Sequence, residues 1–166
     1  IKLINQTNKE GKIIGVVSQK EEGEEDPGIE DINTIGTVAK ILKVLKMPDG
    51  NTTVIIQGKK RFQVAEVITT EPYLTATVRA LEEARPAKDN EEFLVIVETI
   101  KEKSLAIIKD SPNIPSDASF AIKNIESPSF LINFVSSNLN ISVTEKQKLL
   151  QINDLQERAL ETLRYM

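Results

Sequence analysis

The chain has 166 residues, of which 40% are hydrophobic and 28% charged, as in an ordinary globular protein of one domain or one domain with an appendage. Its formal net charge of −4 argues against a surface built to neutralise nucleic-acid phosphates. Cysteine is absent, which excludes a disulfide framework. No apolar run approaches the about 18 residues that span a membrane.

The first third of the chain predicts a helix, a strand and a loop. The sequence opens at Ile1 inside a helical pattern, and we expect it to be a piece of a longer protein. Residues 12–19 are apolar at both parities, which predicts a strand covered on both faces. In residues 21–31, seven of eleven side chains are acidic. That density predicts a solvated loop, and the spacing of a calcium-binding loop is absent.

The next stretch predicts long antiparallel strands. Residues 34–47 form one strand whose apolar side chains change parity, which indicates a bulge or cover on both faces. Pro48-Asp49-Gly50 predicts a hairpin turn, because proline presets φ and glycine supplies a positive φ. Gly58-Lys59-Lys60 predicts a second reversal. Residues 74–82 alternate in polarity, which predicts one buried face carrying Leu74, Ala76, Val78 and Ala80.

From residue 84 onward the pattern becomes helical. Asp89 and Glu92 predict a capping box that opens a helix over residues 90–109. Residues 117–124 predict a short helix, and Ser127-Pro128 predicts the start of the next, with Phe130, Leu131, Phe134 and Val135 on its apolar face. Thr144 and Gln147 predict another capping box. Asn153 or Asp154 caps a last helix whose apolar residues, Leu155, Ala159, Leu163 and Met166, favour a continuation or a partner.

These elements predict an α+β chain with two parts. Residues 1–84 form a small antiparallel β pseudo-barrel of the PUA-like kind, and residues 85–166 form a helical bundle of four or five helices.

The residue types argue against catalysis by this chain. It has no histidine and no cysteine, and no serine lies in G-x-S-x-G. Gly58-Lys59 lacks the upstream glycine of a phosphate-binding loop. The adjacent carboxylates Glu82/Glu83 and Glu91/Glu92 fit helix starts or solvated faces better than a shared-proton pair. We therefore predict no catalytic, cofactor-binding or metal site.

Three motifs of the strand region and two of the last helices carry a family resemblance. They are Gly36-Thr37-Val38-Ala39, Leu45–Gly50, Gly58–Phe62, Glu145-Lys146-Gln147 and Asp154–Arg158. Together they resemble the amino-terminal domain of the Lon ATP-dependent proteases, strongly over residues 35–64 and moderately over residues 129–163. Members of that family begin with an additional strand-rich stretch, so the barrel here is expected to lack its first strands.

The resemblance implies a function for the parent protein. That protein would be an ATP-dependent serine endopeptidase with a Ser-Lys dyad, using ATP and Mg in modules that are absent here. It would work in the cytoplasm of a bacterium, or in an organelle matrix, as a homo-hexameric ring. The present region would recognise unfolded, damaged or degron-bearing proteins and support ring assembly, without binding membranes or nucleic acid.

Four residues are candidate polypeptide contacts: Met47, Pro48, Phe62 and Tyr73. Met47 and Pro48 fall at the predicted hairpin tip, and Phe62 or Tyr73 would line a nearby groove. Ordinary core or turn packing is the alternative for each of them. Two other functions stay open for the chain, a free-standing barrel-type ligand-binding domain and a purely structural oligomerisation spacer.

Overall fold

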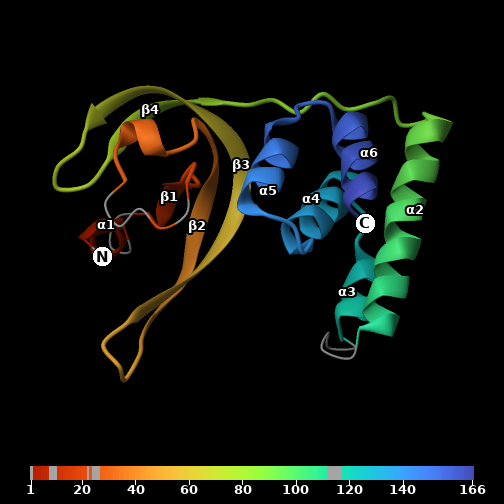
Figure 1. The fold of residues 1–166 in the computed structure, drawn as a ribbon, viewed down its shortest axis with the longest axis horizontal. Coiled ribbons are helices and arrows are strands. Elements are labelled where there is room, and N and C mark those ends of the chain that lie inside the picture. Colours follow the sequence, from red (N-terminus) through yellow and green to blue (C-terminus); the bar gives the residue numbers. More distant parts are fainter. Residues whose placement is uncertain (1, 8–10, 22, 24–26, 112–116) are drawn as a thin grey trace. The chain divides into compact units, whose positions relative to one another are not determined.

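The computed structural model describes residues 2–7, 11–21, 23, 27–111 and 117–166. The chain divides into two compact units, Ile1–Glu82 and Glu83–Met166, and each is described by itself. Unit 1 holds the strands and unit 2 holds five helices (Figure 1). The α+β prediction is therefore confirmed.

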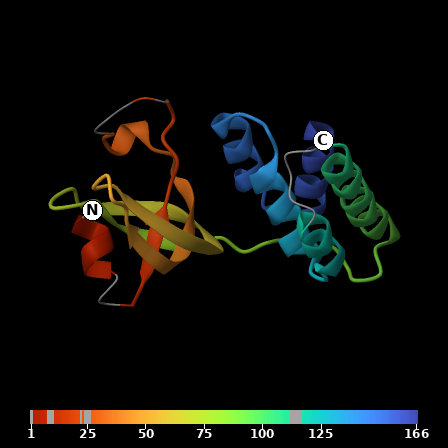
Figure 2. The same ribbon diagram turned by 90° about the horizontal axis from the view of Figure 1, so that it is seen from below.

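Unit 1 is a four-stranded antiparallel sheet in the order β1-β2-β3-β4 (Figures 1 and 2). The strands bend strongly, yet among the described residues β1 and β4 do not pair with each other, so the sheet is open. Part of the acidic segment at 21–31 lies outside the described residues, and its end forms one 3-10 turn. The elements are α1 (Lys2–Thr7), β1 (Ile13–Val16), η1 (Ile29–Asp31), β2 (Ile35–Lys46), β3 (Thr52–Thr69) and β4 (Thr75–Ala80).

The expected reversal at Gly58-Lys59-Lys60 is wrong. β3 continues through these residues, and Val38 pairs with Lys60 while Ala39 pairs with Gly58. Lys59 is therefore the extra residue of a β-bulge. A glycine inside a strand marks a bulge as readily as a turn, and here it bends the strand without ending it. The second register shift, which leaves Leu42 as the extra residue of β2, confirms the bulge predicted in residues 34–47.

The two outer strands are less covered than the sequence predicts. In β1, Ile13 and Val16 are exposed, so the expectation of cover on both faces is wrong. In β4, Val78 and Ala80 are exposed, so the predicted buried face is wrong as well. Both strands lie at edges of the described sheet, where alternation sets which side chains share a face but not whether that face is covered.

Phe62 forms the centre of unit 1. Phe62 is only 3% exposed, and its ring lies over Gly15 of β1 and Gly36 of β2. A Cβ at Gly36 would lie 2.3 Å from the carbonyl oxygen of Val16 and 3.0 Å from the ring. Only glycine lets β1, β2 and the aromatic ring approach this closely.

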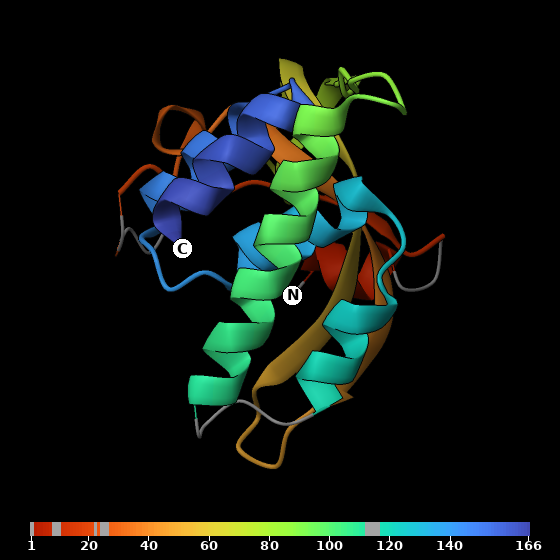
Figure 3. The ribbon, with the colours of Figure 1, turned by 90° about the vertical axis from the view of Figure 1, so that its right-hand side faces the viewer.

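Unit 2 packs its helices around one apolar core. α2 lies against α3, α4 and α6 (Figure 3). Its buried residues recur at three and four positions, as expected for a helix packed on one side. The helices are α2 (Glu91–Asp110), α3 (Asp117–Asn124), α4 (Pro128–Asn138), α5 (Val143–Gln151) and α6 (Leu155–Tyr165), and the buried core is Phe93, Ile96, Ile100, Ile122, Leu131, Ile132, Val135, Leu155 and Ala159.

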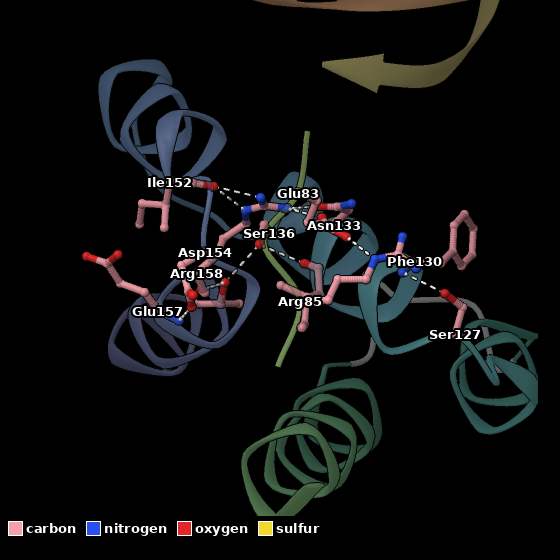
Figure 4. Close-up of polar contacts among 12 residues, drawn as sticks. Glu83, Arg85, Ser127, Phe130, Asn133, Ser136, Ile152, Asp154, Glu157 and Arg158 are labelled. Carbon is pink, nitrogen blue, oxygen red and sulfur yellow. Dashed lines mark hydrogen bonds and ion pairs between the residues drawn. The ribbon is translucent and has the colours of Figure 1, made fainter. Parts of the chain in front are cut away.

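The helix starts follow capping chemistry, with two corrections. Ser127 and Asp154 cap α4 and α6 as predicted, each accepting a hydrogen bond from a backbone N–H three residues later (Figure 4). α2 is capped by Asn90, not by Asp89. The capping box of α5 is Ser142 with Glu145, two residues earlier than the predicted Thr144 with Gln147. Both corrections shift the cap by one or two residues, because neighbouring polar side chains compete for the same role.

Two predicted apolar faces also differ from the structure. Phe130 is exposed, and Ile132 replaces it in the core of α4. On α6, Leu155 and Ala159 are buried, and Leu163 and Met166 pack against the same core. These four residues therefore contribute to the core of unit 2, and the continuation or partner stays a prediction.

Arg158 is the most buried large polar side chain of unit 2, with 1% exposure. Its guanidinium donates from Nε and Nη2 to the carbonyl oxygen of Ile152, at 3.0 and 2.6 Å. Nη1 donates to Glu83 Oε2 at 3.0 Å and to Asn133 Oδ1 at 2.9 Å (Figure 4). One side chain thus ties the start of the unit to α4 and to the α5–α6 junction.

Glu83 is the counterion of this buried cation. Burial acts to raise the pKa of its carboxyl, but hydrogen bonds from Ser129 and Arg158 and the charge of Arg158 outweigh burial and lower the pKa. The expectation of a helix-start or solvated role for Glu83 is therefore wrong. Glu91 and Glu92 do begin α2, as expected.

We predict that Gly36→Ala destabilises unit 1 by about 2 kcal/mol or more, because the new methyl group would overlap backbone that cannot move without breaking the β1–β2 pairing. Gly58→Ala is the matched control, since its Cβ would meet only a methyl group of Thr37 at 3.2 Å. Amide hydrogen exchange of β2 and β3 measures both variants. Equal exchange in the two would contradict the close approach at Gly36.

We predict that Glu83→Gln lowers the free energy of unfolding of unit 2 by about 2 kcal/mol at pH 7, because it leaves a buried guanidinium without its counterion. The folded pKa of Glu83 lies below its ordinary 4.5. Its contribution is therefore complete above pH 4.5 and is lost as the pH falls through the folded value.

Urea unfolding followed by circular dichroism at a helical wavelength measures this difference, since the long helices belong to unit 2. The gap between wild type and Glu83→Gln should narrow below pH 4.5. Glu82→Gln, an exposed neighbour, should match wild type throughout. A gap that stays constant down to acid pH would show that the charge of Glu83 is not what stabilises the unit.

Candidate functional site

β2 and β3 extend past both outer strands as a two-stranded arm, residues 42–57. β1 pairs with β2 only as far as Lys40, and β4 pairs with β3 only from Phe62 onward. Beyond those points the two long strands pair only with each other, which Figure 1 shows as the hairpin at the lower end of unit 1. A two-stranded hairpin has two open edges and little core, so its side chains and backbone face solvent.

The tip of the arm is a tight, internally bonded turn. Met47 N–H donates to the carbonyl oxygen of Asn51 at 2.8 Å, and Gly50 N–H donates to that of Met47 at 3.0 Å. Gly50 has a φ of 87°, which the turn requires and glycine permits. The turn at Pro48-Asp49-Gly50 is therefore confirmed.

Asp49 fixes this turn through Asn51. Its carboxylate accepts from the Asn51 backbone N–H at 3.0 Å and from Asn51 Nδ2 at 2.8 Å. These bonds, the backbone one first, lower the pKa of the Asp49 carboxyl. The single carboxylate of the arm is thus engaged locally.

Four large apolar side chains of the arm face solvent. Leu42 is 53% exposed, Met47 44%, Ile55 44% and Ile56 41%. Leu42 is the bulged residue next to the pair formed by Lys43 and Ile55. Apolar side chains gathered on a projecting, edge-exposed hairpin are the kind of surface that meets an extended polypeptide.

The structure does not bring the four candidate contact residues together. Met47 and Pro48 lie exposed at the tip of the arm. Phe62 is packed in the centre of the sheet. Tyr73 is half-buried in the β3–β4 connection, at the other end of β3 from the tip, and its hydroxyl donates to Gln6 Oε1 at 2.7 Å. Polypeptide contact stays a prediction for all four, and accessibility favours the first two.

Sequence reasoning overlooked Leu42, Ile55 and Ile56. The change of parity near Leu42 was the available signal, since a bulge turns one extra side chain outward. The exposure of the two isoleucines depends on where the outer strands stop. Residue types alone do not reveal that point.

Each unit also has a shallow groove. In unit 1, Phe62 lines a groove of about 360 Å³ together with Ile13, Val38, Val78 and Ala80, and cations border it. In unit 2, α2, α3 and the start of α4 border a groove of about 680 Å³ with apolar walls. Its lining includes two carboxylates and two cations, Glu98, Glu126, Lys101 and Lys123. Of the residues that the structure describes, no serine, threonine, cysteine or histidine lines either groove.

The described residues do not fit a nucleotide or metal site. Gly58 and Lys59 lie within β3, not between a strand and a helix N-terminus, where backbone N–H groups could surround a phosphate. The described part of the chain has no group of three carboxylates, histidines or cysteines that could hold a metal ion. Nor does any of its helices have the length and apolar character to cross a bilayer.

Comparison with known sequences covers the whole chain. Residues 1–166 match the family model of the ATP-dependent protease La (LON) substrate-binding domain. The chain is 66% identical over 166 residues to a Lon protease of Flavobacterium johnsoniae and 44% identical over 166 residues to one of Cytophaga hutchinsonii. In both cases the match covers all of this chain and 20% of the relative, so the chain spans about a fifth of their length.

Two solved structures share the fold. The crystal structure of a Lon N-terminal domain protein from Xanthomonas campestris aligns with a TM-score of 0.66 at 16% identity, covering 99% of this chain and 82% of that one. The N-terminal domain of Mycobacterium avium complex Lon protease aligns with a TM-score of 0.68 at 19% identity, covering 92% and 88%. With the open sheet, the following helical unit and the match over all 166 residues, the chain belongs to the family of Lon protease N-terminal substrate-binding domains.

Proposed function

We propose that this domain holds unfolded or damaged protein segments on the β2–β3 arm, for degradation by ATPase and peptidase modules elsewhere in the same protein. One observation carries the proposal: the arm exposes Leu42, Met47, Ile55 and Ile56 where neither strand has an outer neighbour. The domain breaks no bond itself. It positions clients.

The chemistry of an unfolded segment matches the arm. Such a segment presents apolar side chains and unpaired backbone groups, and the arm presents both at one place. A client can pack its side chains on the exposed leucine and isoleucines while its backbone pairs with either open edge. Met47 at the tip adds an unbranched thioether that adapts to differing client shapes.

The expected affinity is low. Burying a half-exposed aliphatic side chain stabilises a complex by about 1 kcal/mol, and association itself costs several kcal/mol. Four such side chains therefore give weak, readily reversible binding. Several domains in one oligomer would raise the effective concentration of arms, which suits a protein that must accept many clients and release them.

Membership of the family supports further proposals about the parent protein. We infer that it is an ATP-dependent serine endopeptidase with a Ser-Lys dyad, that ATP and Mg bind outside the described residues, and that it acts in the cytoplasm as a homo-hexamer. We further infer that its clients include damaged and degron-bearing proteins.

The two alternatives have less support. A free-standing ligand-binding domain calls for an enclosed cavity with convergent polar groups, whereas the grooves here are open and shallow. A purely structural spacer was favoured by the apolar residues of the last helix, but these pack within unit 2.

The test measures binding of a permanently unfolded casein to the 166-residue chain by fluorescence anisotropy. We predict that the triple variant Leu42→Thr/Met47→Thr/Ile55→Thr binds at least about tenfold more weakly, because three of the four contact side chains lose apolar surface. Threonine keeps the β propensity of the arm, so circular dichroism should be unchanged.

The matched control changes three exposed apolar side chains of unit 2: Leu94→Gln/Val95→Gln/Phe120→Gln. Glutamine preserves the helices, and casein binding should stay within about twofold of wild type. If the control loses binding and the arm variant does not, client contact lies in unit 2. If neither binds less than wild type, the arm has no role in holding clients.

A further inference from the structure

The arm and its base have a charge opposite to that of the chain as a whole. Residues 40–61 contain six cations, Lys40, Lys43, Lys46, Lys59, Lys60 and Arg61, and one carboxylate, Asp49. The whole chain has 21 cations and 25 carboxylates. Cations are therefore concentrated around the exposed apolar side chains, and anions are depleted there.

The lysines of this region are not engaged by the protein's own carboxylates. Among the described residues, no ion pair includes a lysine of residues 40–61, whereas Arg85, Arg158 and Arg164 of unit 2 are ion-paired. Asp49 is bonded to Asn51, and Lys59 Nζ donates to the neutral Gln57 Oε1 at 2.6 Å. Lys40, Lys43, Lys46 and Lys60 are all exposed.

Lysines of β2 lie beside exposed apolar residues of the arm. Lys43 lies opposite Ile55, next to the bulged Leu42, and Lys46 precedes Met47 at the tip. A segment lying along the arm would therefore meet an apolar contact and a cation within one or two residues of each other. A client with the same spacing of apolar side chains and carboxylates would satisfy both.

We propose that the arm selects among unfolded segments for those in which apolar side chains lie within one or two residues of Asp or Glu. The inference rests on the proposed function, to which it adds a client class. Complementary charge increases the association rate and excludes basic segments, which like charges repel. The domain would thus favour acidic, apolar stretches over basic ones of equal hydrophobicity.

Edge protection is the competing explanation for these lysines. Charged side chains on an open strand edge prevent the arms of two molecules from pairing. Reversing the charge separates the two roles, because glutamate protects an edge as lysine does but repels an acidic client. A lysine-to-glutamate variant should therefore still prevent the arms of two molecules from pairing under both explanations, and lose acidic clients under only one.

The experiment uses three 12-residue peptides of identical apolar sequence, with leucine and phenylalanine at alternate positions. The intervening residues are Glu, Gln or Lys, and each peptide carries an uncharged fluorophore. Anisotropy with the 166-residue chain should give about tenfold tighter binding for the Glu peptide than for the Gln peptide, and the Lys peptide should bind most weakly. The Glu preference should shrink several-fold between about 50 and about 300 mM salt, because exposed charges are screened.

Lys43→Glu/Lys46→Glu should reverse the order of the Glu and Lys peptides and leave the Gln peptide within about twofold of wild type. The control, Lys88→Glu/Lys103→Glu, makes the same change in net charge at exposed residues of unit 2 and should keep the wild-type order. If the two variants have equal effects, the preference for the Glu peptide depends on the net charge of the chain and not on the arm, and the inference is overturned.

Two other outcomes would also overturn it. Equal binding of the Glu and Gln peptides would show that the arm does not select acidic segments. If Leu42→Thr/Met47→Thr/Ile55→Thr still weakens the binding of both peptides, the proposed function stands without this selectivity. Binding of poly-glutamate or a single-stranded oligonucleotide as tight as that of the Glu peptide would identify a general polyanion surface.

Discussion

The pairing of β2 with β3 continues through Gly58 without a turn, and the arm exists because of it. A reversal at Gly58 would have ended β3 there, whereas the strand continues from Thr52 to Thr69. Instead two bulges, at Lys59 and Leu42, bend one long ribbon. The first bulge shifts the β2–β3 register by one residue next to the site where Phe62 packs on Gly15 and Gly36, and the second leaves Leu42 exposed. The same ribbon thus forms the centre of unit 1 at one end and an exposed surface at the other.

In unit 2, a single buried side chain connects several helices. Arg158 uses four hydrogen bonds to hold Glu83, Asn133 and the carbonyl oxygen of Ile152. A buried guanidinium is costly unless its donors are satisfied, so its partners must all be in place before the unit is stable. This makes the cluster a specificity device for the packing of α4, α5 and α6, and it explains a perturbed carboxyl that has no catalytic neighbour. The lowered pKa of Glu83 has a structural cause, its bonds to Ser129 and Arg158.

The sequence predicted the elements that depend on local chemistry. It missed the features that depend on which strands cover a given side chain. The Pro48-Asp49-Gly50 turn, the Ser127 cap, a last cap at Asn153 or Asp154 and the four or five helices depend on residues near one another in sequence. The structure has the turn, the caps at Ser127 and Asp154, and α2 to α6. The reversal at Gly58 failed because a bulge and a turn both use glycine, and the choice between them depends on the partner strand. The exposure of Leu42, Ile55 and Val78 depends on where β1 and β4 stop. Arg158 gave no signal, since its partners lie up to 75 residues away.

An exposed ribbon is both a binding surface and a hazard. Two open edges with apolar side chains are what an unfolded client needs, and they are also what a second copy of the arm would need to pair with it. Charge distinguishes a client from a second copy of the arm, whereas hydrophobicity does not. Like-charged arms repel one another, whereas a client of opposite charge is attracted to the same lysines. The cations around Leu42, Met47 and Ile55 therefore allow the surface to stay apolar enough to hold a client while the domains remain apart, and selectivity for acidic segments is the direct physical consequence of that arrangement.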